Sequence, residues 1–430
     1  MKLKSITLQN FKGIESLTIE LDGKSTVIFG INGVGKSTIL RSIDLLYANI
    51  IAKLTGNGKK RTTDLDYDDI SYGKSKTMIN ALFSFEDGIE MEYGRSIERA
   101  SGKNNNTAKL KRLTDKFEKN YLVKGHDDGY GNWIEEIDNK NMPVFVNYGV
   151  NRIVLDVPVR APKEQFIKLD AFDKAIESTI DFRNLFKWFR NQEDIENQEK
   201  VRENSDYVDK SLTSVKRAML AMLDGFEDIH IDRKSLAMKV RKDGQYLKIN
   251  QLSDGEKCTI ALFGDLARRM TLANPERENP LEGTGVVLID ELDLHMHTSW
   301  QRKVLGILEE TFPNIQFIIT THSPQILGEV DDTFNLLYMF KEGKKLSLKS
   351  YKSFVGWDTN VILEEVMHTS SVNLEIKEML NTLYTYIEEK NFDKAEKLAD
   401  ILDEKSNGYV EGVAKARILI SRGQRYEKNK

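Results

Sequence analysis

The sequence predicts an α/β fold: a mainly parallel sheet that carries a glycine-rich loop, with an antiparallel β subdomain before it and helical segments inserted and appended. Two observations carry this prediction. The apolar run STVIFG leads through a glycine-rich loop into STILRSIDLLYANI, which has helical periodicity. Farther along, GVVLID and IQFIITTH are buried-strand runs separated by a helical segment, which is typical of parallel strands joined by right-handed crossovers.

The composition indicates a globular chain with a well-solvated exterior, since 40% of the 430 residues are hydrophobic and 30% are charged. The apolar runs are much shorter than the about 20 residues that cross a bilayer, and the N-terminus lacks the apolar stretch of a secretory signal. The single cysteine, Cys258, excludes an internal disulfide and fits a reducing compartment. We therefore expect a cytoplasmic protein without membrane contact. With a net charge of −4, any nucleic-acid contact must come from a local patch.

The remaining elements follow from local periodicity and turn residues. Alternating apolar residues near the N-terminus predict two or three strands of the antiparallel subdomain. Residues 172–225 have helical period, and the pair Asp243 and Gly244 predicts a hairpin turn shortly before a helix from about Cys258. The last hundred residues are predicted to be helical, with two apolar faces separated by KNFD.

This order of elements suggests two parts. We expect a head over residues 1–330, with a mixed and helical insertion at about 50–225, and a helical extension over residues 331–430. Within the insertion, short strand candidates lie at 77–84 and 89–97.

The segment SGKNNNTAKLKRLTDKFEKNYLVKG is strongly basic, because it carries seven lysine and arginine residues against Asp115 and Glu118. We expect a solvated insertion or a mobile arm here. The alternative is contact with nucleic-acid phosphates, for which this segment would be the local patch.

The stretch GINGVGKST has the spacing G-x-x-x-x-G-K-[ST] of a phosphate-binding loop, and it lies between a predicted strand and a predicted helix, as the mechanism requires. Its glycines let successive backbone N–H groups surround a phosphate, and the helix N-terminus adds positive potential. Lys36 can reach the β- and γ-phosphates of ATP, and Ser37 can ligate Mg²⁺. The residues expected to contact the nucleotide here are Gly30, Asn32, Gly33, Gly35, Lys36, Ser37 and Thr38.

Two acids follow the apolar run GVVLI, at the edge where a parallel sheet binds ligands. Asp290 is expected to hold Mg²⁺ together with Ser37. Glu291, the next residue, is expected to orient or deprotonate the attacking water. A solvated turn is the alternative for two adjacent acids, but such a turn rarely follows a run of four buried residues.

His322 follows the buried run IQFIITT, and we expect its ring to contact the γ-phosphate; the alternative is a histidine that merely caps a strand end. His295 and His297, in DLHMHTSW, invite a metal interpretation. Alternate positions diverge on a helix and no cysteine or third histidine lies near, so we do not expect a metal there.

The stretch QLSDGEKCTI contains no metal-ligand spacing and no nucleophile–base pair. With GINGVGKST before it and VVLIDE and THS after it, the set resembles the ATPase heads of the ABC class, and best the branch containing the RecF, SMC and overcoming-lysogenization-defect proteins. The start, ITLQNFKGIESLTIEL, resembles the strand–turn–strand that opens that branch. The resemblance implies an ABC-type ATPase head that binds ATP and Mg²⁺.

It also implies a homodimer or higher oligomer in which the signature loop of one head closes on the ATP of the other. Ser253, Gly255 and Glu256 are the signature residues expected at the partner's nucleotide. Asp254 stands where the commoner LSGGQ has glycine, which predicts weaker affinity and slow hydrolysis. Asn151, after VFVNYG, is the candidate for the Q-loop residue.

The region VGWDTNVILEEVMHTSSVN and the helical pair after it resemble a narrower group, the bacterial anti-phage ATPases that include the Septu subunit and its retron-linked relatives. This resemblance implies a defence ATPase that controls a separate effector, an HNH-type nuclease, docked on the C-terminal helices. Those helices alternatively cap the head. Two other functions stay open: a DNA repair or recombination ATPase of RecF or SMC type, and a transporter nucleotide-binding subunit.

Overall fold

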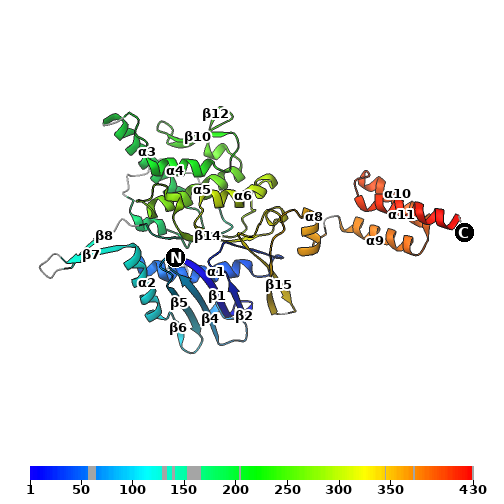
Figure 1. Cartoon of the computed structure of the whole chain (residues 1–430), viewed down its shortest axis with the longest axis horizontal. Coiled ribbons are helices and arrows are strands. Elements are labelled where there is room, and N and C mark those ends of the chain that lie inside the picture. The colour runs from blue at the N-terminus through cyan, green and yellow to red at the C-terminus, as the bar shows by residue number, and fades with distance from the viewer. Residues whose placement is uncertain are drawn as a thin grey trace. The chain divides into compact units, whose positions relative to one another are not determined.

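The computed structural model divides the chain into two compact units, Met1–Gly356 and Trp357–Lys430 (Figure 1). The residues that the structure describes are 1–56, 64–127, 133–137, 141–152, 166–202, 205–343, 345–370 and 373–428. Among these residues, none of the helices is both long enough and apolar enough to cross a lipid bilayer.

The centre of the first unit is a six-stranded sheet with the order β16-β15-β3-β14-β13-β9. Five neighbouring strands are parallel, and β16 pairs antiparallel with β15 at one edge. All residues of β3, β9, β13 and β14 are buried, as their continuous apolar runs require for a sheet covered on both faces. The strands are β3 (Thr26–Phe29), β9 (Val144–Tyr148), β13 (Gly285–Ile289), β14 (Ile315–Thr321), β15 (Asn335–Glu342) and β16 (Lys345–Tyr351). The predicted mainly parallel sheet is confirmed.

A second, antiparallel sheet has the order β2-β1-β4-β5-β6. In β1 the apolar residues Leu3, Ile6 and Leu8 are fully buried, so one face of the strand packs into the core while the other carries polar residues. Its strands are β1 (Lys2–Phe11), β2 (Ile14–Glu20), β4 (Lys76–Ser84), β5 (Glu90–Glu98) and β6 (Gly102–Asn104). The N-terminal antiparallel subdomain is confirmed, and the strand candidates at 77–84 and 89–97 belong to it.

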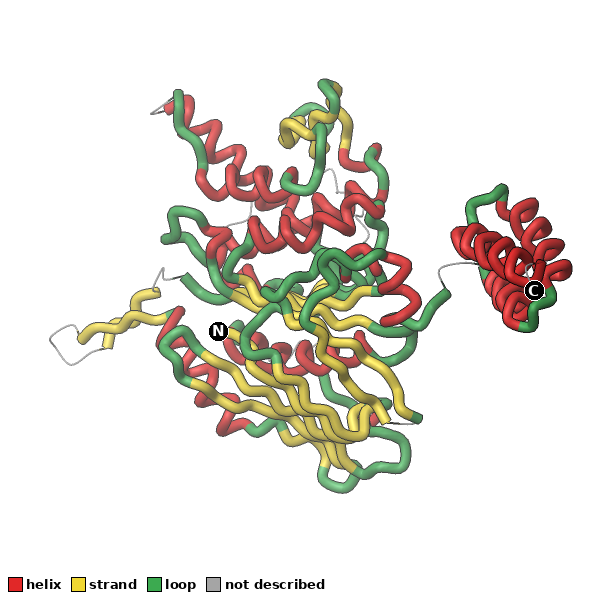
Figure 2. The backbone as a smooth tube through the Cα atoms, turned by 45° about the vertical axis from the view of Figure 1, so that its right-hand side comes forward, coloured by secondary structure: helices red, strands yellow, loops and turns green. Residues whose placement is uncertain are grey.

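The first unit is layered around these two sheets. Helix α1 lies between them and contacts strands of both, whereas α5 lies on the other side of the central sheet (Figures 1 and 2). The longer helices are α1 (Lys36–Leu54), α2 (Thr107–Tyr121), α3 (Phe182–Arg202), α4 (Lys210–Leu220), α5 (Asp254–Ala273) and α6 (Thr298–Thr311), with the short α7 (Pro324–Leu327). The region at about 50–225 is therefore only partly an insertion, because β4–β6 complete one sheet and β9 forms an edge of the other, while α2, α3 and α4 are its longer helices.

The basic segment requires a correction. It forms β6, the helix α2 and the start of the two-stranded hairpin β7 (Val123–Asp127) and β8 (Trp133–Ile137). Leu110, Leu113 and Phe117 of α2 are buried, so the helix is a packed element and no solvated arm. The reason is the apolar spacing i, i+3, i+7, which gives α2 one buried face under its charged one.

The hairpin before the signature helix is as predicted. β10 (Phe226–Asp232), β11 (Ala237–Lys242) and β12 (Gln245–Lys248) form a three-stranded antiparallel sheet. Asp243 and Gly244 both have positive φ, 48° and 78°, as a two-residue primed turn between β11 and β12 demands.

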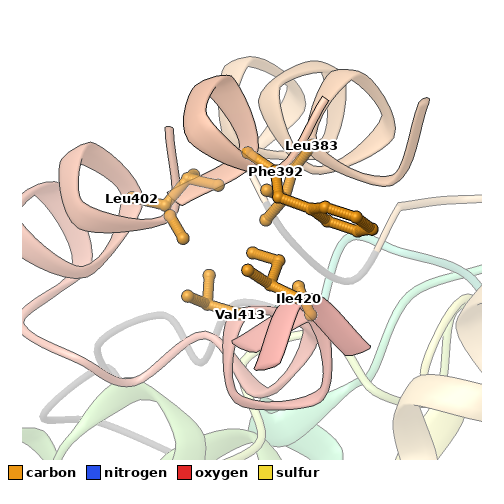
Figure 3. Close-up of a cluster of buried hydrophobic side chains, with 8 residues drawn as sticks. Leu383, Phe392, Leu402, Val413 and Ile420 are labelled. Carbon is orange, nitrogen blue, oxygen red and sulfur yellow. The ribbon is translucent and has the colours of Figure 1, made fainter. Parts of the chain in front are cut away.

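The second unit has its own core. After a short helical stretch, α8 (Thr359–Val361) followed by a π turn (Ile362–Val366), come α9 (Leu374–Glu388), α10 (Phe392–Ser406) and α11 (Glu411–Lys428). Leu383, Phe392, Leu402, Val413 and Ile420 point toward one another between these three helices (Figure 3). The predicted start of the extension at residue 331 is corrected: β15 and β16 pair into the central sheet, so the helical unit begins at Trp357.

Candidate active site

Three parallel strands end together at one edge of the central sheet. Phe29 of β3 is in register with Thr321 of β14, and Ile289 of β13 is in register with Ile319 of the same strand. The phosphate loop, the acidic pair and His322 follow these strand ends directly. Because carboxyl ends of parallel strands form the binding edge of such sheets, segments separated by almost 300 residues meet there.

The phosphate loop is held in a conformation that needs its glycines. Gly30, Gly33 and Gly35 have φ of 152°, 72° and 118°, in the region that side chains disfavour. A Cβ on Gly30 would lie 2.2 Å from the carbonyl oxygen of Met339 on the adjacent β15. Asn32 is exposed beside these glycines. The loop backbone therefore lies tightly against the sheet while its tip faces solvent.

Helix α1 starts at this loop with its N-terminus uncovered. Gly35 is its N-cap residue, and within the residues that the structure describes no side chain caps the helix and no acid lies in its first turn. The first N–H groups of a helix have no partner inside it, and the dipole adds positive potential there. Ser37 is exposed and Thr38 half-buried in the same turn. This is the arrangement of an anion-binding site.

Lys36 points back over the loop. Its side chain is buried, and Nζ donates to the carbonyl oxygens of Gly30 at 3.0 Å and Ile31 at 3.2 Å. Burial lowers the pKa of Lys36 to about 8, although the charges of Glu291 and Asp290 oppose that shift. The ammonium therefore lies within electrostatic reach of the acids that follow β13, and its Nζ is placed to donate to a phosphate held in the loop.

Thr320 lies near the end of β14, the strand between β3 and β13, and its hydroxyl contacts both residues of the acidic pair. Its Oγ1 donates to Asp290 Oδ1 at 2.5 Å and accepts from the N–H of Glu291 at 2.8 Å. Because the single hydroxyl proton of Thr320 goes to Asp290, the hydroxyl orients this carboxyl by donating to its Oδ1. Mg²⁺ bound with a nucleotide needs only one or two protein ligands, so the Ser37 hydroxyl and the Asp290 carboxylate fit it.

Glu291 sits in a conformation that its surroundings impose. Its φ is 48°, in the left-handed region, which costs a residue with a side chain about 1 kcal/mol or more. Thr320 holds the N–H of Glu291, and the guanidinium of Arg152 donates to its carbonyl oxygen and, at 2.6 Å, to that of Asp290. Sequence reasoning missed Arg152 and Thr320, since neither belongs to a recognisable motif.

His322 is half-buried just after β14. Its backbone N–H donates to Asp293 Oδ1 at 3.2 Å, and Thr321 Oγ1 donates to the same oxygen at 2.6 Å. Burial and then the charge of Lys36 lower the pKa of His322, although Asp293 opposes the shift. This shift favours the neutral imidazole, in which one ring nitrogen can donate a hydrogen bond. Asp293 was also missed by sequence reasoning.

The signature turn lies at the N-terminus of α5 and is closed on itself. Ser253 Oγ donates to Glu256 Oε2 at 2.8 Å and accepts from the Glu256 N–H at 3.4 Å, which together with the Ser253 N–H forms a capping box. Lys242 Nζ donates to the other Glu256 oxygen at 2.6 Å. A Cβ on Gly255 would lie 2.4 Å from the carbonyl oxygen of His295, so the turn packs against the segment that follows the acidic pair.

The structure thus brings the phosphate loop, the acidic pair and His322 together, and it shows no bond from the signature residues to the phosphate loop within the described ranges. Asn151, the Q-loop candidate, is exposed after β9. His297 serves as the N-cap of α6, where its ring accepts from the N–H of Ser299 at 3.3 Å.

Comparison with known proteins gives a family match. Residues 25–328 match the family model described as "AAA domain, putative AbiEii toxin, Type IV TA system". The matched range spans all the motifs listed above, from the phosphate loop to His322.

Several relatives cover most of the chain. "Retron Ec83 probable ATPase" of Escherichia coli is 29% identical over 433 residues, which cover 86% of this chain and 77% of that protein. "Retron Vc95 probable ATPase" of Vibrio cholerae is 29% identical and covers 78% and 75%. "Septu protein PtuA" of Bacillus thuringiensis is 25% identical and covers 85% and 84%. The resemblance to retron-linked and Septu ATPases is confirmed.

One solved structure shows a weaker similarity to this chain. The SMC head domain from Thermotoga maritima has a TM-score of 0.46 and 17% identity, with 82% of this chain and all of that chain covered. This similarity is too weak to support a functional argument.

Proposed function

Since this chain belongs to the family described as "AAA domain, putative AbiEii toxin, Type IV TA system", we propose that it is the ATP-binding and hydrolysing subunit of a bacterial anti-phage defence complex. Two heads associate through sandwiched ATP and control a separate effector nuclease in the cytoplasm. One observation carries the ATPase part: Lys36 lies within electrostatic reach of Asp290, Glu291 and His322 at the edge where three parallel strands end.

In the proposed reaction, the N–H groups at the start of α1 and the Lys36 ammonium bind the phosphates of ATP. Ser37 and Asp290 hold Mg²⁺, which, when bound, neutralises charge on the phosphates. Glu291 accepts a proton from the attacking water. The neutral ring of His322 donates a hydrogen bond to the γ-phosphate. Each group acts from a strand end or helix end whose backbone is already fixed, which limits the reorganisation needed for the reaction.

The dimer proposal concerns the signature turn. Ser253 and Asp254 are exposed at the N-terminus of α5, and so they are accessible to the nucleotide of another head. If the hydrogen bond from the Ser253 hydroxyl to Glu256 breaks, the hydroxyl can donate to the γ-phosphate of the ATP held by the other head, as expected for an ATP sandwich. The Septu and retron relatives support the assignment to defence.

The effector is proposed to be a separate polypeptide of the HNH nuclease type. The unit Trp357–Lys430 has its own helical core, and it exposes Tyr409 and Leu374 to 91% and 71%. We propose these two exposed side chains as contacts for the effector. Affinity capture with the full chain and with a chain that lacks this unit tests the docking proposal. Removing the unit should abolish capture of the nuclease and leave ATP binding unchanged.

We also propose that α2 contacts nucleic acid. Lys109 pairs with Glu92 and Lys116 with Asp87, whereas the adjacent Lys111 and Arg112 are exposed and are proposed to contact phosphates. Changing both to glutamine should flatten the salt dependence of DNA binding by roughly 0.9 per lost contact. Absence of measurable DNA affinity in the unchanged protein at low salt would remove this proposal.

Hydrolysis is tested with Glu291→Gln, which keeps the shape and removes the base. The variant should bind ATP and hydrolyse it roughly 10²–10⁴-fold more slowly. Glu310→Gln, an exposed acid on α6, is the matched control and should hydrolyse normally. Unchanged turnover in Glu291→Gln would refute the base role.

The shared site is tested by mixing two inactive subunits, Lys36→Ala and Ser253→Arg. In a mixed dimer one composite site carries both lesions, and the other has an intact Lys36 and an intact Ser253. That site should close on ATP, so differently tagged subunits should associate only when nucleotide is present. If wild-type subunits associate with ATP and the mixture never does, Ser253 does not contribute to a shared site.

A further inference from the structure

Arg152, just after the edge strand β9, is a buried cation placed against the acidic turn. Only 3% of its surface is exposed. Its Nη2 donates to the carbonyl oxygens of Asp290, at 2.6 Å, and of Glu291, and its Nε donates to the carbonyl oxygen of Gly149 at 3.1 Å. The guanidinium therefore binds two consecutive carbonyls of the turn and one of its own loop.

The turn that Arg152 binds needs such support. Glu291 has φ of 48°, and a backbone in that region relaxes unless the surroundings hold it. Thr320 holds the N–H side of Glu291, and Arg152 holds the carbonyl side. A planar guanidinium can donate in several fixed directions at once, which a lysine ammonium at the end of a flexible chain does not reproduce.

Arg152 also connects this turn to the signature helix. The carbonyl oxygen of Arg152 accepts from Cys258 Sγ at 3.2 Å, and Cys258 lies about one turn after the Ser253 cap of α5. The start of α5 also contacts the segment that follows the acidic pair, where Gly255 packs against the carbonyl of His295. The N-terminal part of α5 therefore has two contacts to this region, one through Arg152 and one through His295.

We propose that Arg152 is a positioning residue for ATP hydrolysis, which holds the Asp290–Glu291 peptide in its productive conformation and couples that conformation to the signature helix through Cys258. The proposal rests on the proposed ATPase function. It assigns Arg152 no contact with ATP: Arg152 acts through Glu291. Removing it should therefore slow the chemical step and leave ATP binding by the phosphate loop almost unchanged.

Arg152→Lys is the main test, with Arg95→Lys as matched control. Arg95 is equally buried and also donates to a backbone carbonyl, that of Leu45, but its bonds go to α1 and to the segment around Asp64. Arg152→Lys should lower kcat about 10- to 100-fold, the usual cost of losing a group that orients a reacting residue, with KM changed less than threefold. Arg95→Lys should lower stability and keep kcat.

Cys258 variants test the coupling. Cys258→Ala, which removes the donor, should reduce kcat several-fold, whereas Cys258→Ser keeps a donor and should stay near the parent value. If both residues act on one turn, the loss in Arg152→Lys with Cys258→Ala should be smaller than the product of the single losses. Strictly multiplicative losses would overturn the coupling to α5.

Amide hydrogen exchange separates this proposal from the proposed function. If Glu291→Gln is slow but Arg152→Lys hydrolyses ATP normally, the positioning role is wrong while the ATPase assignment stands. If Glu291→Gln hydrolyses ATP normally, the base role fails. Hydrogen exchange at the N–H groups of Glu291 and Leu292 then tests separately whether Arg152 positions the turn. Faster exchange there in Arg152→Lys, and not in Arg95→Lys, supports positioning; equal exchange in both overturns it.

Discussion

Two helices of the head begin at glycine-containing turns, yet their N-termini are built in opposite ways. α1 starts after Gly35 with no capping side chain among the described residues, no acid in its first turn and Lys36 at its first position. α5 starts after Ser253 with a complete capping box and with Asp254 and Glu256 in its first turn. Both helix ends have the same backbone dipole, so their side chains decide what each can bind.

The difference indicates that one terminus is ready for an anion and the other must be opened. At α1, a phosphate meets free N–H groups and a lysine. At α5, the Ser253 hydroxyl has one proton and gives it to Glu256, which Lys242 also holds. Ser253 can donate to a phosphate only by releasing Glu256. We therefore expect ATP to bind a single head first, and the signature turn to engage in a later and weaker step.

The largest expected effect comes from removing the lysine at the N-terminus of α1. Lys36→Ala should weaken ATP binding about 10- to 100-fold, because a hydrogen bond to a charged group contributes about 1.5–3 kcal/mol. It should not destabilise the fold, since burial disfavours the charged lysine. Calorimetric titration with Mg²⁺ and ATP, together with urea unfolding, measures both. Ser253→Ala is the control at the other terminus, and equal loss of single-head binding in both variants would contradict the comparison.

The pH dependence of the same terminus gives the next effect. The pKa of Lys36 is lowered to about 8 from 10.5, so between these values the unfolded chain binds more protons than the folded one. The Lys36 contribution to stability therefore rises with pH through this window. ATP binding requires the ammonium and should weaken up to about tenfold per pH unit above 8.

Lys36→Arg is the control for this measurement, because an arginine keeps its charge throughout the range. Its ATP affinity should be independent of pH between 7 and 10. A wild-type affinity that is equally flat would show that the ammonium does not lose its proton in this window.

Removing the capping box at the N-terminus of α5 should lower the free energy of unfolding. Ser253→Ala removes the cap of α5 and should lower the free energy of unfolding by about 1 kcal/mol. Ser253→Thr keeps the hydroxyl and should lose much less. ATP binding by separate heads should be unchanged in both, as measured by titration below the concentration at which heads associate. A cap that contributes nothing to the unfolding free energy would mean that the α5 terminus is not closed in solution.

The smallest effect concerns Asp254, which is exposed and pairs with Lys257 at 2.6 Å. Asp254→Asn removes a negative charge that would face the partner's phosphates, so ATP-dependent association should tighten about two- to threefold at low salt, within the usual range for a charge near a helix end. Screening should abolish this gain at 1 M salt. Glu276→Gln, an exposed acid after α5, controls for net charge and should not change association. A weaker association of Asp254→Asn would contradict the predicted repulsion.

The motifs could be predicted because each is a local chemical unit. The phosphate loop needs glycines, a lysine and a hydroxyl within nine residues, and the acidic pair needs a buried strand directly before it. The hairpin at Asp243 and Gly244 was predictable for the same reason, since two positive φ angles are a property of the turn alone. The packing of α2 was missed because net charge was weighed above the apolar spacing of Leu110, Leu113 and Phe117.

By itself the sequence determined the strand, loop and helix around the phosphate loop, and the acids and histidine that end the buried strands, because these depend on residues adjacent in the chain. The tertiary structure alone decided which distant residues support them. Arg152 and Thr320 contact Glu291 only because β9 and β14 flank β13 in the sheet. Likewise β15 joins the sheet beside β3 by hydrogen bonds that its own residues do not reveal. Such contacts depend on strand order, which no short stretch of sequence encodes.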